Sequence, residues 1–170
     1  MPPRRLRLDA ELVRRGLARS REHASSLIET RRVSVNKLVA TKPAMGVTTD
    51  ADLVALEQLH ERLNRHAAQG QINDYYAVNF SIHEAIITLA DNRWLAQVIG
   101  DLRKILRLAR HKSLHAPGRM QQSLAEHLAV FAALKARDCD AAEEAMRTHL
   151  LRQRDALRDV ARNQQSRLTP

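Results

Sequence analysis

Residues 123–150, SLAEHLAVFAALKARDCDAAEEAMRTHL, decide the fold of most of this 170-residue chain. Apolar side chains and His127 recur there at steps of three and four residues up to Leu134, which is the spacing of one helix face. Asp138 interrupts the pattern, and a second helical stretch that carries His149 follows it. Because short connections join antiparallel neighbours, the stretch predicts two packed helices.

The same helical pattern extends outward from this stretch over residues 51–163. Ala and Leu dominate and aromatic residues make up only 3% of the chain, which favours helix over sheet. Five helices are expected, at 51–68, 72–90, 93–114, 118–136 and 139–163. Gly70, Asp91-Asn92, Pro117-Gly118 and Asp138 separate them. We therefore predict an antiparallel all-helical bundle over 51–163 and a frayed polar tail at 164–170.

Residues 1–50 have a different pattern. Asp9 can cap a short helix over 10–15 that ends at Gly16, and Ser20 can cap a second helix over 21–29. The apolar period then changes to two around Asn36, which predicts a short hairpin. The chain is thus expected to be mainly α, with a small α+β module at 1–50 before the bundle.

The positive charge of the chain is concentrated in this N-terminal module. Residues 1–50 hold 11 Lys and Arg against 5 Asp and Glu, a net charge of +6, whereas residues 51–170 hold 17 against 14, or +3. A small basic module indicates a polyanionic partner. The candidates for contacts with phosphates are Arg14, Arg15, Arg19, Arg21, Arg31, Arg32 and Lys37.

Composition also excludes several classes of protein. The single cysteine, Cys139, excludes a disulfide framework and a zinc site built on several thiolates. No apolar stretch approaches the ~20 residues of a membrane span, and the first residues lack the apolar run of a signal peptide. No glycine-rich cofactor loop follows a strand. We expect a cytoplasmic, non-enzymatic protein without membrane contact.

The N-terminal module resembles the RNA-binding domain named after ribosomal protein S-four. The residues that carry this resemblance are Arg7-Leu8-Asp9, Gly16, Ser20-Arg21, Ala24, Leu27-Ile28 and Val33-x-Val35-Asn36. The longer runs LDAELVRRGLARSREHA (8–24) and VATKPA (39–44) resemble the N-terminus of the TlyA family of haemolysins and ribosomal RNA 2′-O-methyltransferases. The resemblance implies structured RNA as a partner, with DNA less favoured. Arg31 and Lys37 stand where that family has glycine, and a non-glycine residue at positive φ costs about 1 kcal/mol.

Three histidines of the bundle, His83, His127 and His149, lie in three of the expected helices. Neutral imidazole is the commonest metal-ligating side chain, and ligands on facing helices can converge in a bundle core. Asn79 shares a helix face with His83, so both can reach one ion. The alternative is that these are buried histidines bonded to neighbours. Surface or incidental roles are expected for His23, His60, His66, His111 and His115.

From residue 51 the chain resembles the FCD domain, the effector-binding half of FadR-like GntR transcription regulators. The matching residues are Asn79-x-x-x-His83, Glu84, Ile86, Asn92, Glu126-His127 and Met146-Arg147-x-His149. The resemblance implies a divalent metal, most simply zinc or nickel, held by Asn79, His83, His127 and His149, with Asn79 replacing the family's aspartate.

It also implies a small carboxylate effector, for which Arg107 and Arg110 are candidates. The family's first helices are not recognisable before residue 51, so the bundle is expected to be truncated and to expose apolar surface. Such surface favours a homodimer.

These features together favour a non-enzymatic binding protein with an RNA-binding-like head and a ligand- and metal-sensing bundle. A fusion or a remnant would fit the unusual pairing. One alternative is a GntR/FadR-type transcription regulator that binds nucleic acid through its basic head. A second is a truncated TlyA-like rRNA methyltransferase or haemolysin that lacks its catalytic domain.

Overall fold

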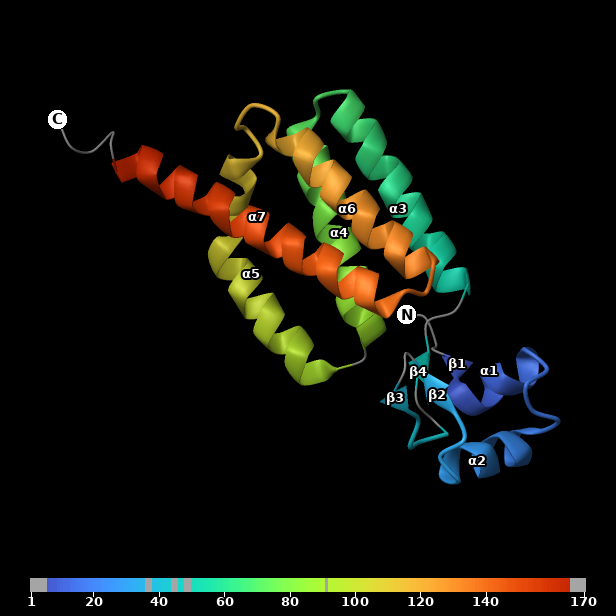
Figure 1. Cartoon of the computed structure of the whole chain (residues 1–170). Coiled ribbons are helices and arrows are strands. Elements are labelled where there is room, and N and C mark those ends of the chain that lie inside the picture. The colour runs from blue at the N-terminus through green and yellow to red at the C-terminus, as the bar shows by residue number, and fades with distance from the viewer. Residues whose placement is uncertain (1–5, 36–37, 44–45, 48–49, 91, 166–170) are drawn as a thin grey trace. The chain divides into compact units, whose positions relative to one another are not determined.

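The computed structural model describes residues 6–35, 38–43, 46–47, 50–90 and 92–165. The chain forms two compact units, Met1–Leu53 and Val54–Pro170. Each unit has a buried hydrophobic cluster of its own. A small α+β part followed by a helical bundle confirms the predicted fold class (Figure 1).

The described residues of the N-terminal unit form two helices and four two-residue strands. These are β1 (Leu6–Arg7), α1 (Leu8–Arg14), α2 (Arg21–Glu29), β2 (Ser34–Val35), β3 (Leu38–Val39) and β4 (Gly46–Val47). Strands β2 and β3 pair antiparallel where the hairpin was predicted, while its turn residues, Asn36 and Lys37, lie outside the described residues. Strand β1 also pairs antiparallel with β4, which the sequence pattern did not indicate.

Two helix caps were predicted in this unit, and the structure confirms one of them. The side chain of Ser20 accepts a hydrogen bond from the His23 amide, so Ser20 caps α2 as predicted. The prediction that Asp9 caps α1 was wrong, because α1 begins at Leu8 and Asp9 lies within its first turn. The Asp9 side chain is buried and binds the guanidinium groups of Arg7 and Arg21 instead.

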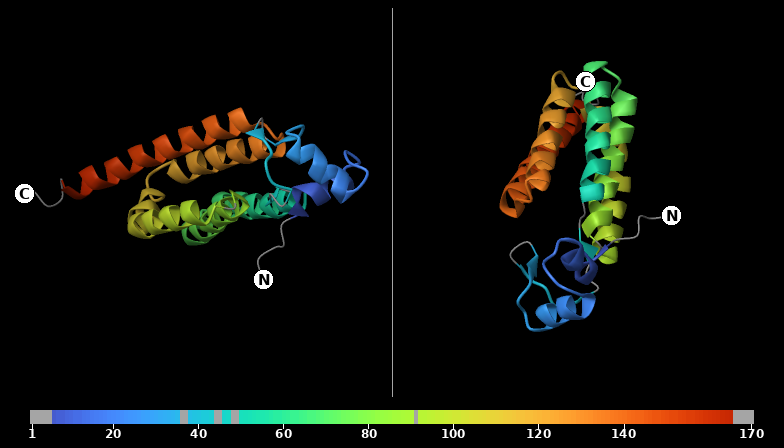
Figure 2. Two further views of the ribbon diagram at one scale, coloured as in Figure 1. Left: turned by 90° about the horizontal axis from the view of Figure 1, so that it is seen from below. Right: turned by 90° about the vertical axis from the view of Figure 1, so that its right-hand side faces the viewer.

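Five long helices are formed by the described residues from Asp50 onward. Their bounds are α3 (Asp50–Ala68), α4 (Ile72–Ala90), α5 (Arg93–Ser113), α6 (Arg119–Lys135) and α7 (Cys139–Gln165). In the views of Figure 2, α6 and α7 run side by side, as do α3 and α4. Each bound lies within two residues of the prediction. Helix α7 includes residues 164–165 of the expected tail, and residues 166–170 lie outside the described part.

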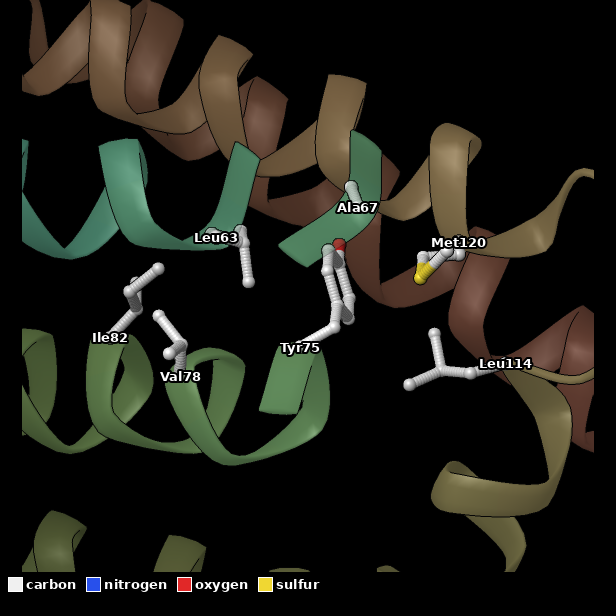
Figure 3. Packing of buried hydrophobic residues seen from close by; sticks show 7 residues of the cluster. All are labelled: Leu63, Ala67, Tyr75, Val78, Ile82, Leu114 and Met120. Atoms are coloured by element: carbon white, nitrogen blue, oxygen red, sulfur yellow. The ribbon is translucent and has the colours of Figure 1, made fainter. Parts of the chain in front are cut away.

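The core of the bundle fixes the orientation of α4 (Figure 3). Tyr75 and Ile82 of α4 are fully buried and belong to one cluster with Leu63 of α3. Leu114 and Met120 extend this cluster beyond α5 and into α6. Since a helix advances 100° per residue, the side chains that follow each buried position point to the adjacent face of α4. That face carries the residues of the candidate site.

Candidate metal centre

Three imidazoles from α4, α6 and α7 converge in the bundle. One ring nitrogen each of His83, His127 and His149 lies within 4.8 Å of the others. Their ring centroids are 4.8–5.5 Å apart. Imidazole nitrogens at zinc's usual bond length would be roughly 3.3 Å apart in a tetrahedral site. Small side-chain movements would therefore suffice to close the three nitrogens on one ion.

Glu126 orients one of these rings. The Nδ1 atom of His149 donates a hydrogen bond to Glu126 Oε2 at 2.8 Å, and both side chains are buried. In the neutral ring, a proton on Nδ1 leaves Nε2 with its lone pair. This Nε2 and that of His83 are enclosed and have no hydrogen-bond partner among the described residues. An imidazole bonded to a carboxylate through one nitrogen and bare at the other is typical of a metal ligand.

Burial keeps two of the rings neutral. Burial, together with the charge of the neighbouring His149, lowers the pKa of His127 to about 2. Burial likewise lowers the pKa of His83 well below its ordinary value, with His127 and Arg110 adding to the effect. Both rings are therefore unprotonated at neutral pH, which is the form that binds a metal.

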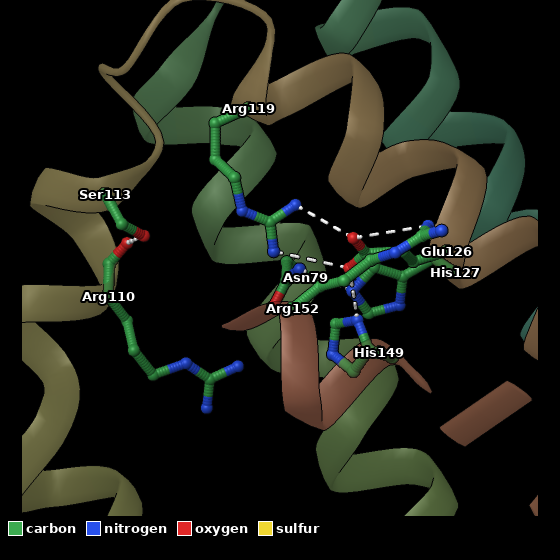
Figure 4. Close-up of polar contacts among 8 residues, drawn as sticks. All are labelled: Asn79, Arg110, Ser113, Arg119, Glu126, His127, His149 and Arg152. Carbon is green, nitrogen blue, oxygen red and sulfur yellow. Dashed lines mark hydrogen bonds and ion pairs between the residues drawn. The ribbon is translucent and has the colours of Figure 1, made fainter. Parts of the chain in front are cut away.

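Asn79 lies next to the cluster through His127 (Figure 4). Its buried Nδ2 donates a hydrogen bond to His127 Nε2 at 2.6 Å. A metal on His127 Nε2 would displace this bond. Rotation of the amide would then turn Asn79 Oδ1 toward the ion, since the two ends of the amide have nearly the same shape. Asn79 thus offers a neutral oxygen where a carboxylate would add negative charge.

The carboxylate of Glu126 also interacts with two arginines. Arg119 is buried and donates to both oxygens of Glu126, at 3.2 and 3.3 Å. Arg152 of α7 approaches to 3.9 Å (Figure 4). The sequence pattern did not single out Arg119. Its spacing of two helical turns from Glu126, on the face that carries Ser123 and Val130, was the available signal.

Two arginines of α5 are buried beside the site. Arg110 has an enclosed Nε without a hydrogen-bond partner among the described residues, and Figure 4 shows its side chain extending from α5 toward the cluster. Burial lowers its pKa to about 10, so it stays charged at neutral pH. Arg103 pairs with Glu84 at 3.1 Å. Arg107, the other predicted effector residue, is exposed, and Arg103 was not predicted.

The structure contradicts the expected surface position of His60. His60 is only 3% exposed, and its ring stacks on Phe131 with centroids 4.4 Å apart. Its Nδ1 lies 2.7 Å from the Leu56 carbonyl oxygen. The sequence contained a signal for this position, because Leu56, His60 and Leu63 share the buried stripe of α3. His115, by contrast, is exposed as expected.

The candidate phosphate contacts lie on the surface of the N-terminal unit. Lys37 lies outside the described residues. The other candidates are all exposed: Arg14, Arg15, Arg19, Arg21, Arg31 and Arg32. Several are held by buried carboxylates. Asp9 binds Arg21 at 3.1 Å, and Glu11 binds Arg14 and Arg15 at 2.6 Å. Contacts with Arg7 and then Arg21 lower the pKa of Asp9 to about 2, and contacts with Arg14 and Arg15 lower that of Glu11 to about 2.

The helical bundle, in which three imidazoles and an asparagine meet, defines the class of protein to which the chain belongs. The chain belongs to the FCD domain family, whose family model matches residues 38–152. The model of the S4 domain matches residues 6–53. Both resemblances noted in the sequence are thereby confirmed. In the described part of the chain, no helix combines the length and the apolar character needed to cross a membrane.

Individual relatives match one or the other part. The HTH-type transcriptional repressor RspR of Escherichia coli K12 is 26% identical over 117 residues, which are 69% of this chain and 51% of that protein. An uncharacterised HTH-type transcriptional regulator, YdfH of Shigella flexneri, matches equally. The 16S/23S rRNA (cytidine-2′-O)-methyltransferase TlyA of Mycobacterium tuberculosis is 51% identical over 53 residues, 31% of this chain and 20% of that protein. The chain therefore spans about half the length of these regulators and a fifth of the methyltransferase.

Proposed function

We propose that this chain is a non-enzymatic, cytoplasmic regulatory protein whose bundle holds a divalent metal with a small carboxylate and whose N-terminal unit binds structured RNA. The observation that carries the proposal is the convergence of His83, His127 and His149, with two enclosed Nε2 atoms that have no hydrogen-bond partner among the described residues. An unpartnered buried nitrogen is costly unless a ligand completes it.

In this proposal the three imidazoles are the metal ligands, and Asn79 Oδ1 is a weaker fourth. Three imidazole donors suit zinc or nickel. When bound, the metal supplies a positive centre that attracts the oxygen of an anionic effector. Glu126 holds His149 in the ligating orientation, and burial keeps His83 and His127 neutral.

Arg110 supports the choice of a carboxylate as effector. Its guanidinium is buried beside the histidines, and its Nε atom is enclosed without a hydrogen-bond partner among the described residues. A carboxylate in contact with the metal would accept charge-assisted hydrogen bonds from this group. The effector would thus be fixed at one end by the metal and at the other by Arg110.

The N-terminal unit supports an RNA partner through its S4 match and its exposed arginines. Asp9 and Glu11 hold some of these arginines in place, so less side-chain freedom is lost on binding. The names of the HTH-type relatives favour a role in regulation. A clear preference for duplex DNA over hairpin RNA would replace this proposal with a transcription regulator that uses its basic head.

Metal titration of the full chain tests the first half of the proposal. We expect one zinc or nickel ion per chain and a higher melting temperature when it is bound, because the metal binds only the folded state. His127→Ala should abolish both effects. His115→Ala removes an exposed histidine and should leave both unchanged. Equal metal content in wild type and His127→Ala would refute the assignment.

Salt titration of RNA binding tests the second half. The double variant Arg19→Gln/Arg32→Gln should bind hairpin RNA more weakly, with the slope of log K against log salt reduced by about 1 for each arginine. Arg62→Gln/Arg65→Gln makes the same change of charge on exposed residues of α3 and is the matched control. Equal losses in both variants would mean that the N-terminal unit is not the RNA-binding part.

A further inference from the structure

Tyr75 of α4 carries a buried hydroxyl group beside the candidate metal centre. The residue is fully buried, and its Oη atom has no hydrogen-bond partner among the described residues. Its ring belongs to the core cluster, with the hydroxyl at the end of the ring that points away from α4 (Figure 3). An enclosed hydroxyl without a partner destabilises a fold, and phenylalanine would fill the same space without that penalty. The hydroxyl of Tyr75 therefore calls for a ligand-bound state in which it has a partner.

The hydroxyl of Tyr75 lies near the side chains of Ser123 and Asn79. Burial raises the pKa of this hydroxyl to about 12, and the side chains of Ser123 and Asn79 are close enough to act in the opposite direction. Neither of them forms a hydrogen bond with it. The hydroxyl keeps its proton at neutral pH and is thus a donor that has no acceptor.

Two pairs of residues face each other across α4 and α6. Asn79 contacts His127 at 2.6 Å, and four residues earlier in each helix Tyr75 lies near Ser123. Residues four apart share a helix face, so Tyr75 and Asn79 lie on the same side of α4. Since helix side chains lean toward the N-terminus, the amide of Asn79 extends over the turn that carries Tyr75. The hydroxyl is therefore close to the amide group that metal binding would rearrange.

Metal binding changes which end of the Asn79 amide can face His127. Without an ion, Asn79 Nδ2 donates to His127 Nε2. An ion bound to that nitrogen occupies its lone pair, so Nδ2 loses its acceptor and its hydrogens would point at a cation. Rotation of the amide removes this repulsion and turns Oδ1 toward the ion. A carbonyl oxygen has two lone pairs, so Oδ1 can bind the ion and still accept a hydrogen bond.

We propose that Tyr75 is the positioning residue of Asn79: in the metal-bound site its hydroxyl donates a hydrogen bond to Asn79 Oδ1 and holds this oxygen toward the ion. Hydrogen bonds of this kind orient the ligands of metal sites. One ion then gives partners to three enclosed atoms, which are His83 Nε2, His149 Nε2 and Tyr75 Oη. The inference rests on the metal site proposed above and adds to it a residue that does not touch the metal.

Zinc titration of the full chain tests the role of the hydroxyl. Tyr75→Phe should weaken zinc binding about tenfold, the lower end of the effect of losing a hydrogen bond to a ligand. The matched control is Tyr76→Phe, which removes from the same helix a hydroxyl that donates to the Arg107 carbonyl, and it should bind as wild type does. Equal affinities of wild type and Tyr75→Phe would overturn this proposal alone. A wild type that binds no zinc would overturn the proposed metal site with it.

The metal-free chain distinguishes positioning from a structural role of the hydroxyl. Because the hydroxyl has no partner without the ion, Tyr75→Phe should leave the melting temperature of the metal-free bundle unchanged or raise it. A hydroxyl that stabilised the bundle by itself would have the opposite effect. Circular dichroism in the presence of a chelator would measure the melting temperature, and a lower value in Tyr75→Phe would contradict the proposal.

A double-mutant cycle tests whether Tyr75 acts through Asn79. In an Asn79→Ala background the acceptor is absent, so Tyr75→Phe should no longer change the zinc affinity. In an Asn79→Asp background a carboxylate oxygen accepts the same hydrogen bond, and the loss of about tenfold should persist. The three histidines remain in every variant, so the zinc affinity stays measurable. Equal losses with asparagine and with alanine at position 79 would mean that the hydroxyl acts elsewhere, and would overturn the proposal even where zinc binds.

Cobalt in place of zinc gives a spectroscopic test of the same contact. The visible absorption of bound cobalt depends on the number and geometry of its ligands. Tyr75→Phe and Asn79→Ala should change this spectrum in the same direction, because both release Oδ1 from the ion, whereas Tyr76→Phe should keep the wild-type spectrum. A wild-type spectrum in Tyr75→Phe would show that Asn79 keeps its place without the hydroxyl, which contradicts the proposal.

Discussion

At the scale of single residues, Glu126 connects the candidate metal centre with a buried cation. Its carboxylate accepts from His149 and from Arg119, so it both orients an imidazole and neutralises a guanidinium. A carboxylate that receives the second nitrogen of a ligating histidine also raises the basicity of that ligand. The metal affinity should therefore depend on a residue that does not itself touch the metal.

The variant Glu126→Gln should lower metal affinity about 10- to 100-fold, the usual effect of losing such a partner. The amide keeps the shape of the side chain but not its charge, so Arg119 also loses its counter-ion. Calorimetric titration with zinc would measure the change. Glu144→Gln, on an exposed glutamate of α7, is the control and should bind as wild type does.

Asn79→Asp should strengthen metal binding, because a carboxylate oxygen is a stronger ligand for a divalent ion than an amide oxygen. Competition with a chromophoric chelator would measure the affinity. The matched control is Asn73→Asp, which makes the same change on an exposed residue of α4. Equal affinities in wild type and Asn79→Asp would show that position 79 is not a ligand.

Asp9 and Glu11 should make the N-terminal unit sensitive to acid. Arginine contacts lower the pKa of both carboxyl groups to about 2 in the folded unit, from 3.8 and 4.5. Lowered values in the folded state stabilise it above the ordinary pKa values, and this stabilisation is lost as pH falls from about 4.5 to 2. Hydrogen exchange of the α1 and α2 amides should accelerate over that range. The dependence should be shallower in Glu11→Gln, and an unchanged pH profile in that variant would contradict the assignment.

At the scale of elements, the end of α2 carries a conformational strain that can be removed. Arg31 follows this helix with φ at +57°, in the left-handed region that glycine adopts without cost. Arg31→Gly should therefore stabilise the N-terminal unit by about 1 kcal/mol at most, since glycine also gains freedom in the unfolded chain. Urea unfolding followed by circular dichroism would measure the change.

Arg31→Ala separates this strain from the proposed contact of Arg31 with RNA. Alanine removes the charge but keeps the Cβ atom that causes the strain. Both variants should lose the same RNA affinity, and only the glycine variant should gain stability. A loss of affinity in one variant alone would mean that backbone geometry, not charge, sets the contribution of Arg31.

The helices could be predicted closely because local signals mark their ends. The side chain of Asn92 caps α5 by accepting from the amides of Trp94 and Leu95, and Gly70 has the positive φ that its place after α3 requires. The pairing of β1 with β4 could not be predicted, because two-residue strands are too short to show a period. The Asp9 cap was wrong because its carboxylate binds Arg7, two residues before it, and Arg21, which is distant in the sequence.

Helix periodicity decides which residues of the candidate site could be predicted from the sequence. His83, His127 and His149 could be grouped because each helix's period placed them on inner faces. Arg103 and Arg110 lie on a face of α5 that the amphipathic pattern assigns to solvent, so no local signal shows their burial. Only the packing of whole helices brings Arg110 beside the histidines.

At the scale of the whole molecule, the two units have separate cores and should respond differently to metal. The cluster around Ile28 belongs to the first unit, and the cluster around Tyr75 belongs to the second. We expect two thermal transitions in calorimetry. Zinc at 100 times its dissociation constant should stabilise the second unit by about 2.7 kcal/mol and leave the first unchanged. A chelator should reverse the shift, and movement of both transitions would show that the units are coupled.

The separate hydrophobic clusters of the two units have a consequence for the history of the chain. Because the described residues of each cluster all come from one unit, either unit can exchange its neighbour without opening a cavity in its own core. Recombination can then join an S4-type unit to an FCD-type unit in a single step. Selection would act on the combination of the two functions and would require no new packing.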